Sequence, residues 1–313
     1  MMMHTKGRDK IQITINSAHK EVSPKQITPK HSSKHSLSSE QHYPLLKAEK
    51  SLDSMIGMKN VKEFMREMYA LVYVNQKREE RALACAKQNL HMLFIGNPGT
   101  GKTTVARIMA EMLKDMKVIE KGHFIEAERA DLVGEYIGQT AQKTRNLIKK
   151  AEGGILFIDE AYSLARGGEK DFGREAVDTI VKAMEDQQHK FILILAGYPE
   201  EMKRFLKLNP GLPSRFPNKL QFQDFSGGQL FELFQRMAKE KEYVTTKALN
   251  EKLRSHFHSL SYYDKNTQNG RYVRNLLEKM IRKHALRMLD YNDTLDKQSL
   301  MTLEAQDFII EEY

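Results

Sequence analysis

The sequence contains one cysteine in 313 residues and no long apolar run. Because Cys85 is alone, an intramolecular disulfide is impossible, and a reducing compartment is expected. No apolar segment approaches the roughly 20 residues that a membrane-spanning helix needs, and the first residues lack the apolar segment of a signal peptide. We therefore expect a cytoplasmic protein without a membrane span.

The sequence also has little excess charge of one sign. Its 50 Lys and Arg residues exceed its 41 Asp and Glu residues by nine. Residues 1–50 hold nine basic and four acidic residues, so five of the nine net positive charges fall in this segment. A nucleic-acid-binding protein more often concentrates positive charge on a folded face, which argues against nucleic acid as a partner.

The first 50 residues are expected to form a basic, mostly disordered tail. The segment His31–Ser39 is of low complexity and too polar to pack against a core. Its histidines lack nearby acidic or thiol partners, so no metal site is expected there. Ile11–Ile15 alternates apolar and polar residues with the period of a strand and predicts one short strand in the tail.

A strand, a glycine-rich loop and a helix follow one another around residue 96. Met92–Ile95 is an apolar run typical of a buried strand, and helix-forming residues begin at Thr103. The pattern G-x-x-x-x-G-K-T between them predicts a phosphate-binding loop, in which backbone N–H groups and a helix amino end bind phosphate oxygens. The predicted nucleotide-binding residues are Gly96, Asn97, Pro98, Gly99, Thr100, Gly101, Lys102, Thr103 and Thr104.

Four residues carry the chemistry expected of such a site. Lys102 would reach the β- and γ-phosphates, and the Thr103 hydroxyl would be a ligand for Mg²⁺. Asp159 and Glu160 end the apolar run Ile155–Ile158, which is typical of a central parallel strand. Hydrolysis of a triphosphate needs an acid that holds Mg²⁺ and a residue that orients or deprotonates water. We assign these roles to Asp159 and Glu160, respectively.

The order of strands and helices predicts two folded domains. Strands expected at 92–95, 124–127, 155–158, 191–196 and 219–222 alternate with helices, as in an α/β fold with a parallel sheet covered on both faces. Strand patterns stop after Phe225, and helices are expected near 227–241, 246–260, 271–289 and 304–311. We predict an α/β ATPase domain over residues 51–225 and a small all-helical domain over residues 226–313.

Other candidate residues lie outside the phosphate-binding loop. Ile56 and Gly57 precede the loop and could form a wall of an adenine site. Arg215 follows the fourth strand and could supply charge to a γ-phosphate, although a solvated surface arginine is the alternative. Arg271 and Arg274 share a face near a helix amino end, where cations oppose the helix dipole. A bound phosphate would explain them, and salt bridges to nearby acids are the alternative.

Tyr136 and Ile137 stand beside Gly138 in an otherwise polar segment. Buried packing is the default expectation for a large aromatic and an aliphatic residue. If the pair is exposed instead, it would be a contact surface for another chain.

Taken together, these motifs resemble those of the AAA+ ATPases. The resemblance is carried by Gly96–Thr103, Phe157–Tyr162 and Asn209–Phe216. Within the AAA+ ATPases, Ile125–Thr144 and Ala161–Gly173 are similar to the CbxX/CfxQ family, which includes red-type rubisco activases. The resemblance extends from about residue 46 to the C-terminus.

The resemblance implies an AAA+ domain and a helical lid that hydrolyse ATP with Mg²⁺ in a homo-oligomer, expected to be a hexameric ring. Arg215 matches the arginine finger that a neighbouring subunit offers. Arg271 matches the phosphate-sensing arginine of the lid, with Arg274 as the second choice. The segment 136–138 matches the pore loop that grips a substrate polypeptide, so a protein client would be threaded or remodelled.

Two departures from the family pattern leave positions open. Many AAA+ proteins end the fourth strand in a polar sensor residue, whereas this sequence continues Ala196-Gly197-Tyr198. No sensor is therefore assigned. Pro213, two residues before the finger candidate, also stands where relatives often carry another residue.

Four functions are compatible with these motifs. The leading one is a remodeller of a protein client in endospore maturation, because the similarity is greatest to a sporulation member of the family. A rubisco activase is the second, and a DNA-handling ATPase is the third, for which basic pore residues would be expected instead of Tyr136 and Ile137. A nucleotide switch or scaffold with little turnover is the fourth, and Glu160 argues against it.

Overall fold

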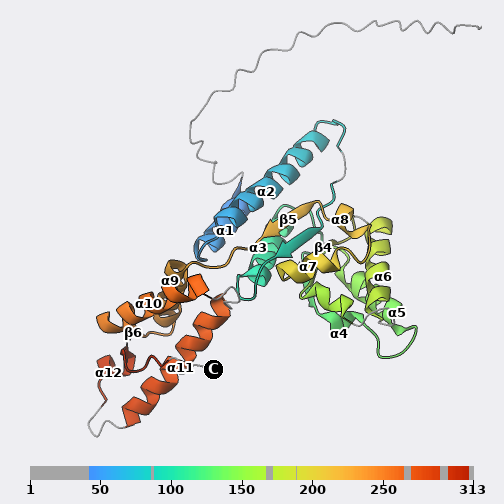
Figure 1. Cartoon of the computed structure of the whole chain (residues 1–313). Helices are drawn as coiled ribbons and strands as arrows, with labels where there is room; N and C mark the ends of the chain where they lie inside the picture. The colour runs from blue at the N-terminus through green and yellow to red at the C-terminus, as the bar shows by residue number, and fades with distance from the viewer. Residues whose placement is uncertain are drawn as a thin grey trace, which may run out of the picture. The chain divides into compact units, whose positions relative to one another are not determined.

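The computed structural model describes residues 42–85, 88–166, 172–187, 189–263, 269–289 and 295–309, and most of its helices and some of its strands are labelled in Figure 1. The strand predicted at 11–15 and the polar segment at 31–39 lie outside the described residues. Among the described helices, none combines the length and apolar character that crossing a bilayer requires.

A five-stranded parallel sheet forms the centre of the α/β domain, with the strand order β2-β3-β4-β1-β5. The strands are β1 (Met92–Ile95), β2 (Phe124–Ala127), β3 (Ile155–Ile158), β4 (Ile192–Gly197) and β5 (Asn218–Gln221). β2 and β3 match the predicted ranges, and β4 and β5 are each displaced by one residue. The alternation of strand and helix that predicted the α/β fold is therefore confirmed.

Two hydrophobic cores cover the two faces of the sheet. Phe94, Phe157 and Ile194 point to the face covered by the first three helices, whereas Leu93 and Leu195 point to the other face. The first face is covered by α1 (Tyr43–Asp53), α2 (Lys59–Glu79) and α3 (Lys102–Asp115). The second is covered by α5 (Gln139–Ala151), α6 (Gly173–Asp186), α7 (Pro199–Phe205) and α8 (Leu212–Arg215). The short helices α4 (Arg129–Leu132) and η1 (Ala161–Ala165) complete the domain.

Helix α1 begins eight residues before the predicted start of the folded chain. It places Leu45, Ala48 and Leu52 in the core, at a helical spacing that gives one apolar face. It packs against α3, the helix that follows the phosphate-binding loop. The segment 43–50 is thus helical and is not part of a disordered tail.

The parallel sheet brings three chain segments to one edge. β4 pairs with both β1 and β3, so the residues that follow these three strands emerge side by side. The phosphate-binding loop follows β1, Asp159 and Glu160 follow β3, and Tyr198 follows β4. This edge of the sheet is where ligands bind in open α/β folds.

The C-terminal part is a helical domain with its own core. It contains α9 (Gly227–Glu240), α10 (Lys247–Tyr263), α11 (Asn269–Leu289) and α12 (Lys297–Met301), joined by a two-residue strand pair, β6 (Val244–Thr245) and β7 (Thr302–Leu303). Apart from that pair, the regular elements described in this domain are helices, as predicted. Ser226 caps the start of α9 through a capping box with Gln229, in which each side chain accepts a hydrogen bond from the other's backbone N–H.

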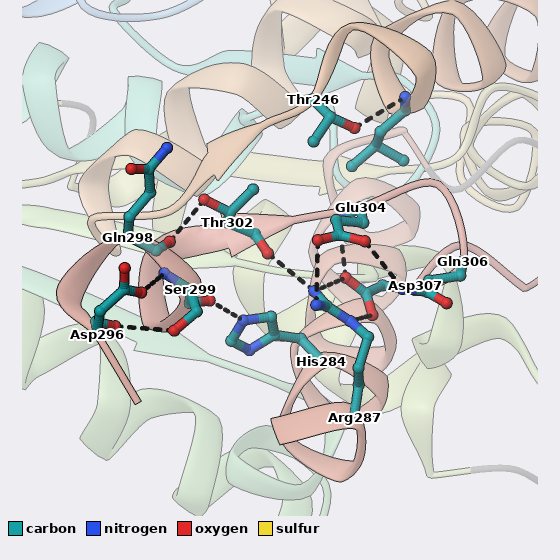
Figure 2. Close-up of polar contacts among 11 residues, drawn as sticks. Thr246, His284, Arg287, Asp296, Gln298, Ser299, Thr302, Glu304, Gln306 and Asp307 are labelled. Carbon is teal, nitrogen blue, oxygen red and sulfur yellow. Dashed lines mark hydrogen bonds and ion pairs between the residues drawn. The ribbon is translucent and has the colours of Figure 1, made fainter. Parts of the chain in front are cut away.

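The predicted last helix at 304–311 is wrong for the residues that the structure describes there. Arg287 donates hydrogen bonds to both carboxylate oxygens of Asp307, at 3.0 and 2.9 Å, and to Glu304 at 3.2 Å (Figure 2). Asp307 also accepts a hydrogen bond of 2.7 Å from the backbone N–H of Glu304. A turn over 304–307 thus attaches the C-terminal segment to α11. The segment does not form a helix there, and its Glu304 and Asp307 side chains pair with Arg287.

Candidate active site

The phosphate-binding loop has the backbone that its sequence predicts. Gly99 and Gly101 have positive φ angles of 73° and 94°, which glycine adopts without steric cost. Gly96 is required for another reason: a Cβ there would lie 2.7 Å from the carbonyl oxygen of Phe222, which follows β5. α3 begins at Lys102, so its positive dipole end faces the loop.

The Lys102 side chain lies inside the loop. It is 7% exposed, and its Nζ donates hydrogen bonds to the carbonyl oxygens of Gly96 at 2.8 Å and Asn97 at 2.9 Å. Burial lowers the pKa of Lys102 to about 8, although the nearby Asp159 opposes this effect. The ammonium is therefore positioned by the loop's own carbonyls at the point where phosphate oxygens would bind.

A cavity of about 420 Å³ opens beside the loop and collects most of the predicted residues. The predicted residues that line it are Ile56, Pro98, Gly99, Gly101, Lys102, Thr103, Thr104, Asp159, Glu160, Arg271 and Arg274. Its apolar wall consists of Met55, Met58, Phe225, Leu233 and Met237 together with Ile56. A larger cavity of about 560 Å³ lies where β3 and β4 begin, and it contains none of the motif residues.

Four predicted residues do not line the cavity. Gly96 is covered by Phe222 and does not line the cavity. Thr100 is buried and donates a hydrogen bond to the carbonyl of Asn97, whose side chain donates to Asp224. Gly57 has a φ of 71° and turns the chain towards α2. Three of these residues therefore shape the phosphate-binding loop, and Gly57 shapes the segment before α2.

Asp159 and Glu160 both line the cavity, and Glu160 has a strained backbone. Its φ and ψ of 46° and 44° lie in the left-handed region, which costs about 1–3 kcal/mol for a residue with a side chain. The Asp159 carboxylate accepts a hydrogen bond of 2.9 Å from the backbone N–H of Glu160 and stabilises this conformation. Strain of this kind is commonly found at functional sites.

Tyr198 is a site residue that the sequence alone did not assign. Its hydroxyl donates a hydrogen bond of 2.9 Å to Oε1 of Glu160, and its ring centroid lies 5.6 Å from the Nζ of Lys102. Burial, aided by the bond to Glu160, raises the pKa of Tyr198, so the phenol stays protonated at neutral pH. Its position after the strand between β1 and β3 is the signal that could have identified it.

The residues present fit a magnesium ion. The Thr103 hydroxyl and the Asp159 carboxylate line the same cavity and are hard oxygen ligands. Among the described residues, no cluster of three or more His, Cys, Asp or Glu side chains could hold a metal by itself. Mg²⁺ in phosphate sites is held by one or two protein groups and the phosphates themselves, which agrees with this pair.

Arg215 is not brought to the cavity. It lies at the end of α8, where it forms an ion pair with Glu185 and donates a hydrogen bond of 2.7 Å to the carbonyl of Gly211. Its Nε is buried and has no hydrogen-bond partner among the residues that the structure describes. Within one chain, the predicted finger is therefore separate from the nucleotide site.

Buried packing, the default expectation for Tyr136 and Ile137, is wrong. Their side chains are 68% and 88% exposed, between α4 and the start of α5. Gly138 has a φ of 83° and provides the turn at which α5 begins. Both side chains of the pair therefore lie in solvent in this chain.

The two parts of the chain match two family models. Residues 92–224 match the model of the ATPase family associated with various cellular activities (AAA), and residues 226–312 match an AAA lid domain. The sequence is 56% identical to stage V sporulation protein K of Bacillus subtilis (strain 168) over 273 residues, which cover 87% of this chain and 84% of that protein. The chain belongs to the CbxX/CfxQ family of AAA ATPases.

The chain is also similar to other proteins of this family and to a solved AAA domain. Protein CfxQ of Xanthobacter flavus is 38% identical over 82% of this chain and 80% of its own length. The chloroplastic ribulose bisphosphate carboxylase/oxygenase activase of Cyanidioschyzon merolae is 40% identical over 82% of this chain and 87% of its own length. The AAA domain of FIGL-1 in complex with ADP has the same fold, with a TM-score of 0.57 at 19% identity over 80% of each chain. The matches support an ATPase activity and a nucleotide-binding site.

Proposed function

We propose that this ATPase remodels a protein client, that it works as a hexameric ring in the cytoplasm, and that its role lies in endospore maturation. The observation that carries the client proposal is the exposure of Tyr136 and Ile137 on a domain that contains a nucleotide site. Two adjacent exposed apolar side chains suit contact with another molecule, because removing their apolar surface from water is favourable. The endospore role rests on the 56% identity to stage V sporulation protein K.

In the proposed reaction, water attacks the γ-phosphorus of ATP and the bond to the bridging oxygen breaks. Lys102 binds the β- and γ-phosphates, and Glu160 accepts the proton of the attacking water. Tyr198 holds one carboxylate oxygen of Glu160, which leaves the other free for water. Mg²⁺, when bound by Thr103 and Asp159, would neutralise phosphate charge.

A short path joins the reaction site to the exposed pair. η1 begins directly after Glu160, and its residue Ser163 accepts a hydrogen bond of 2.7 Å from Arg129 through its carbonyl. Arg129 begins α4, which precedes the segment with Tyr136 and Ile137. A shift at Glu160 can therefore reach the exposed pair through two short helices.

A trapped complex tests the client proposal. Glu160→Gln should bind ATP without hydrolysing it, so it should hold client proteins in the presence of ATP. Capture should be lost in the Glu160→Gln/Tyr136→Ala double variant and retained in Glu160→Gln/Tyr43→Ala, because Tyr43 is also exposed but lies on α1. Equal capture by both double variants would contradict the proposal.

Mixing two inactive variants tests the shared site. Lys102→Ala should lose nucleotide binding, and Arg215→Ala should lose the finger while keeping its own nucleotide pocket. If Arg215 acts on a neighbour's nucleotide, an equal mixture restores activity at about a quarter of the interfaces, where an intact Lys102 faces an intact Arg215. No recovery on mixing would contradict the finger assignment.

A red-type rubisco activase is the second candidate, favoured by the 40% identity to the Cyanidioschyzon merolae activase. In this second role, the chain would use the same nucleotide site and the same exposed pair, and only the client would differ. Rubisco of red type, added to the parent ATPase, distinguishes the two: stimulation of hydrolysis would favour the activase.

A further inference from the structure

Asn269 is a buried polar residue at the start of α11 whose side chain bonds to a different domain. It is 0% exposed, and its φ of 46° lies in the left-handed region, which asparagine tolerates better than most residues. Its Oδ1 accepts a hydrogen bond of 2.8 Å from the backbone N–H of Phe225. Its Nδ2 donates to Asp224 at 2.8 Å and to the carbonyl of Pro98 at 3.3 Å. Donor and acceptor are thus both used, although 171 residues separate Asn269 from Pro98.

Asp224 continues this chain of bonds into the phosphate-binding loop. One oxygen of its carboxylate accepts from Asn269, and the other accepts a hydrogen bond of 2.8 Å from the side chain of Asn97. Asp224 lies between β5 and α9, at the junction of the α/β domain and the lid. Its two oxygens therefore hold the loop and the lid to one another.

A backbone contact reinforces the link one residue further on. The N–H of Gly270 donates a hydrogen bond of 3.1 Å to the carbonyl of Gly99. A Cβ at position 270 would lie 2.9 Å from that oxygen, closer than any ordinary contact, so only glycine permits this approach. Arg271 follows directly and lines the nucleotide cavity.

We propose that Asn269 is a positioning residue for Arg271. The bonds from Asn97 through Asp224 to Asn269 fix the start of α11 against the phosphate-binding loop, and the conformation of the loop thereby sets the place of the Arg271 guanidinium. This inference rests on the proposed role of Arg271 in contacting nucleotide phosphate. It adds that Arg271 contributes to ATP affinity only when the hydrogen bonds that join Asn97, Asp224 and Asn269 are intact.

A simpler role, in which Asn269 only stabilises the lid, makes a different prediction. A stabilising residue would change the unfolding midpoint and leave the contribution of Arg271 to ATP affinity unchanged. A positioning residue couples to Arg271, so the effects of the two substitutions are not additive. The coupling is therefore the readout that separates the two roles.

The test measures the affinity of the full chain for a fluorescent ATP analogue in a double-mutant cycle. Arg271→Ala should weaken binding about tenfold in the parent, as expected for a charge-assisted contact. Asn269→Asp places a second carboxylate against Asp224 and should weaken binding to a similar degree. In that background, Arg271→Ala should weaken binding by less than about twofold further. The control Asn275→Asp changes an exposed asparagine of the same helix and should leave affinity unchanged.

A charge swap should restore the link. In Asn269→Asp/Asp224→Asn, the new amide at 224 donates to the new carboxylate at 269 and still accepts from Asn97, and the carboxylate accepts from the N–H of Phe225. The swap loses the 3.3 Å hydrogen bond to the Pro98 carbonyl, because a carboxylate cannot donate. The swap should recover most of the lost affinity. In the swapped background, Arg271→Ala should again weaken binding about tenfold. Failure to recover either quantity would overturn the proposal.

Gly270→Ala gives the same test without touching a polar group, in case the charged variant does not fold. Its methyl group displaces α11 from Gly99, so the effect of Arg271→Ala should again disappear. Gly228→Ala is the matched control in the lid, because the nearest atom to its added Cβ is 4.0 Å away. An equal effect of Arg271→Ala in all backgrounds would overturn the positioning role alone. The absence of any effect of Arg271→Ala in the parent would overturn the assignment of Arg271 and the proposal with it.

Discussion

The hydroxyl of Tyr198, at the end of β4, donates a hydrogen bond of 2.9 Å to the carboxylate of Glu160, at the end of β3. The same ring lies 5.6 Å from the ammonium of Lys102. One aromatic residue thus contacts both the proposed base and the phosphate-binding lysine. We propose that this phenol acts where many AAA+ proteins carry a polar sensor residue at the end of the fourth strand.

Removal of that hydroxyl should slow hydrolysis and leave nucleotide binding intact. In Tyr198→Phe the ring remains while Glu160 loses its hydrogen bond and with it a fixed orientation. We expect kcat to fall about tenfold, which corresponds to about 1.4 kcal/mol, with little change in the affinity for ATP. Steady-state ATPase assays and a nucleotide titration measure the two quantities. Tyr43→Phe, at an exposed position on α1, is the control, and an unchanged kcat in Tyr198→Phe would contradict the role.

Nucleotide affinity should decrease at alkaline pH because of Lys102. Burial lowers the pKa of this lysine to about 8 in the free protein. Phosphate favours the protonated form, so binding raises the pKa and takes up a proton above pH 8. The logarithm of the affinity should therefore fall by up to about one per pH unit between pH 8 and 9.5. Titration calorimetry in buffers of different ionisation enthalpy measures this proton uptake. Lys102→Arg, which stays charged, should remove it, and a pH-independent parent affinity would contradict the assignment.

Stability at acid pH should depend on His91. Its Nδ1 accepts a hydrogen bond of 2.9 Å from the N–H of Leu193, and its buried Nε2 has no partner within the described part of the chain. Burial, with a smaller effect of His189, lowers the pKa of His91 from 6.5 to about 4. The unfolded chain therefore binds more protons than the folded chain between pH 6.5 and 4. The contribution of His91 is complete above pH 6.5 and decreases as the pH falls to 4, by about 3 kcal/mol in total.

Urea unfolding at pH 7, 6, 5 and 4 measures this contribution. His91→Gln keeps an acceptor but cannot be protonated, so its free energy of unfolding should fall less steeply with decreasing pH than that of the parent. Parallel curves for His91→Gln and the parent would show that His91 is not the titrating group.

The attachment of the C-terminal segment should depend on Asp307. This carboxylate is 2% exposed and accepts hydrogen bonds from Arg287 and from the N–H of Glu304. Asp307→Ala leaves Arg287 without its main partner, which should destabilise the lid by about 3 kcal/mol. Hydrogen exchange of the α11 amides measures the loss. The control Asp53→Ala breaks the ion pair with Lys62, in which the Asp53 carboxylate is 68% exposed. It should lower the free energy of unfolding by less than about 1 kcal/mol, so equal losses in the two variants would contradict this account.

The sequence predicted the parts of the fold that depend on local patterns. β3 is buried on both faces and therefore appears as an uninterrupted apolar run, Ile155–Ile158. The phosphate-binding loop is equally visible, because its glycines and Lys102 have fixed spacing. By contrast, α1 contributes only Leu45, Ala48 and Leu52 to the core, and its polar surroundings concealed it.

The contacts that the sequence did not predict join segments far apart in the chain. Tyr198 bonds to Glu160 because β4 and β3 are neighbours in the sheet. The residues of a single strand do not determine which strands become its neighbours. Asn269 reaches Pro98 across 171 residues, and nothing near either residue indicates the other. Such contacts depend on the packing of whole elements.

The most direct test of the account is the ATPase rate of the parent and of Tyr136→Ala, each measured alone, with lysate protein from sporulating cells, and with DNA. Protein should stimulate the parent about twofold or more and should not stimulate Tyr136→Ala, whose basal rate stays near that of the parent because Tyr136 lies outside the nucleotide cavity. Tyr43→Ala should behave like the parent. Stimulation by DNA alone, or stimulation by protein that persists in Tyr136→Ala, would contradict a protein client gripped by the exposed pair.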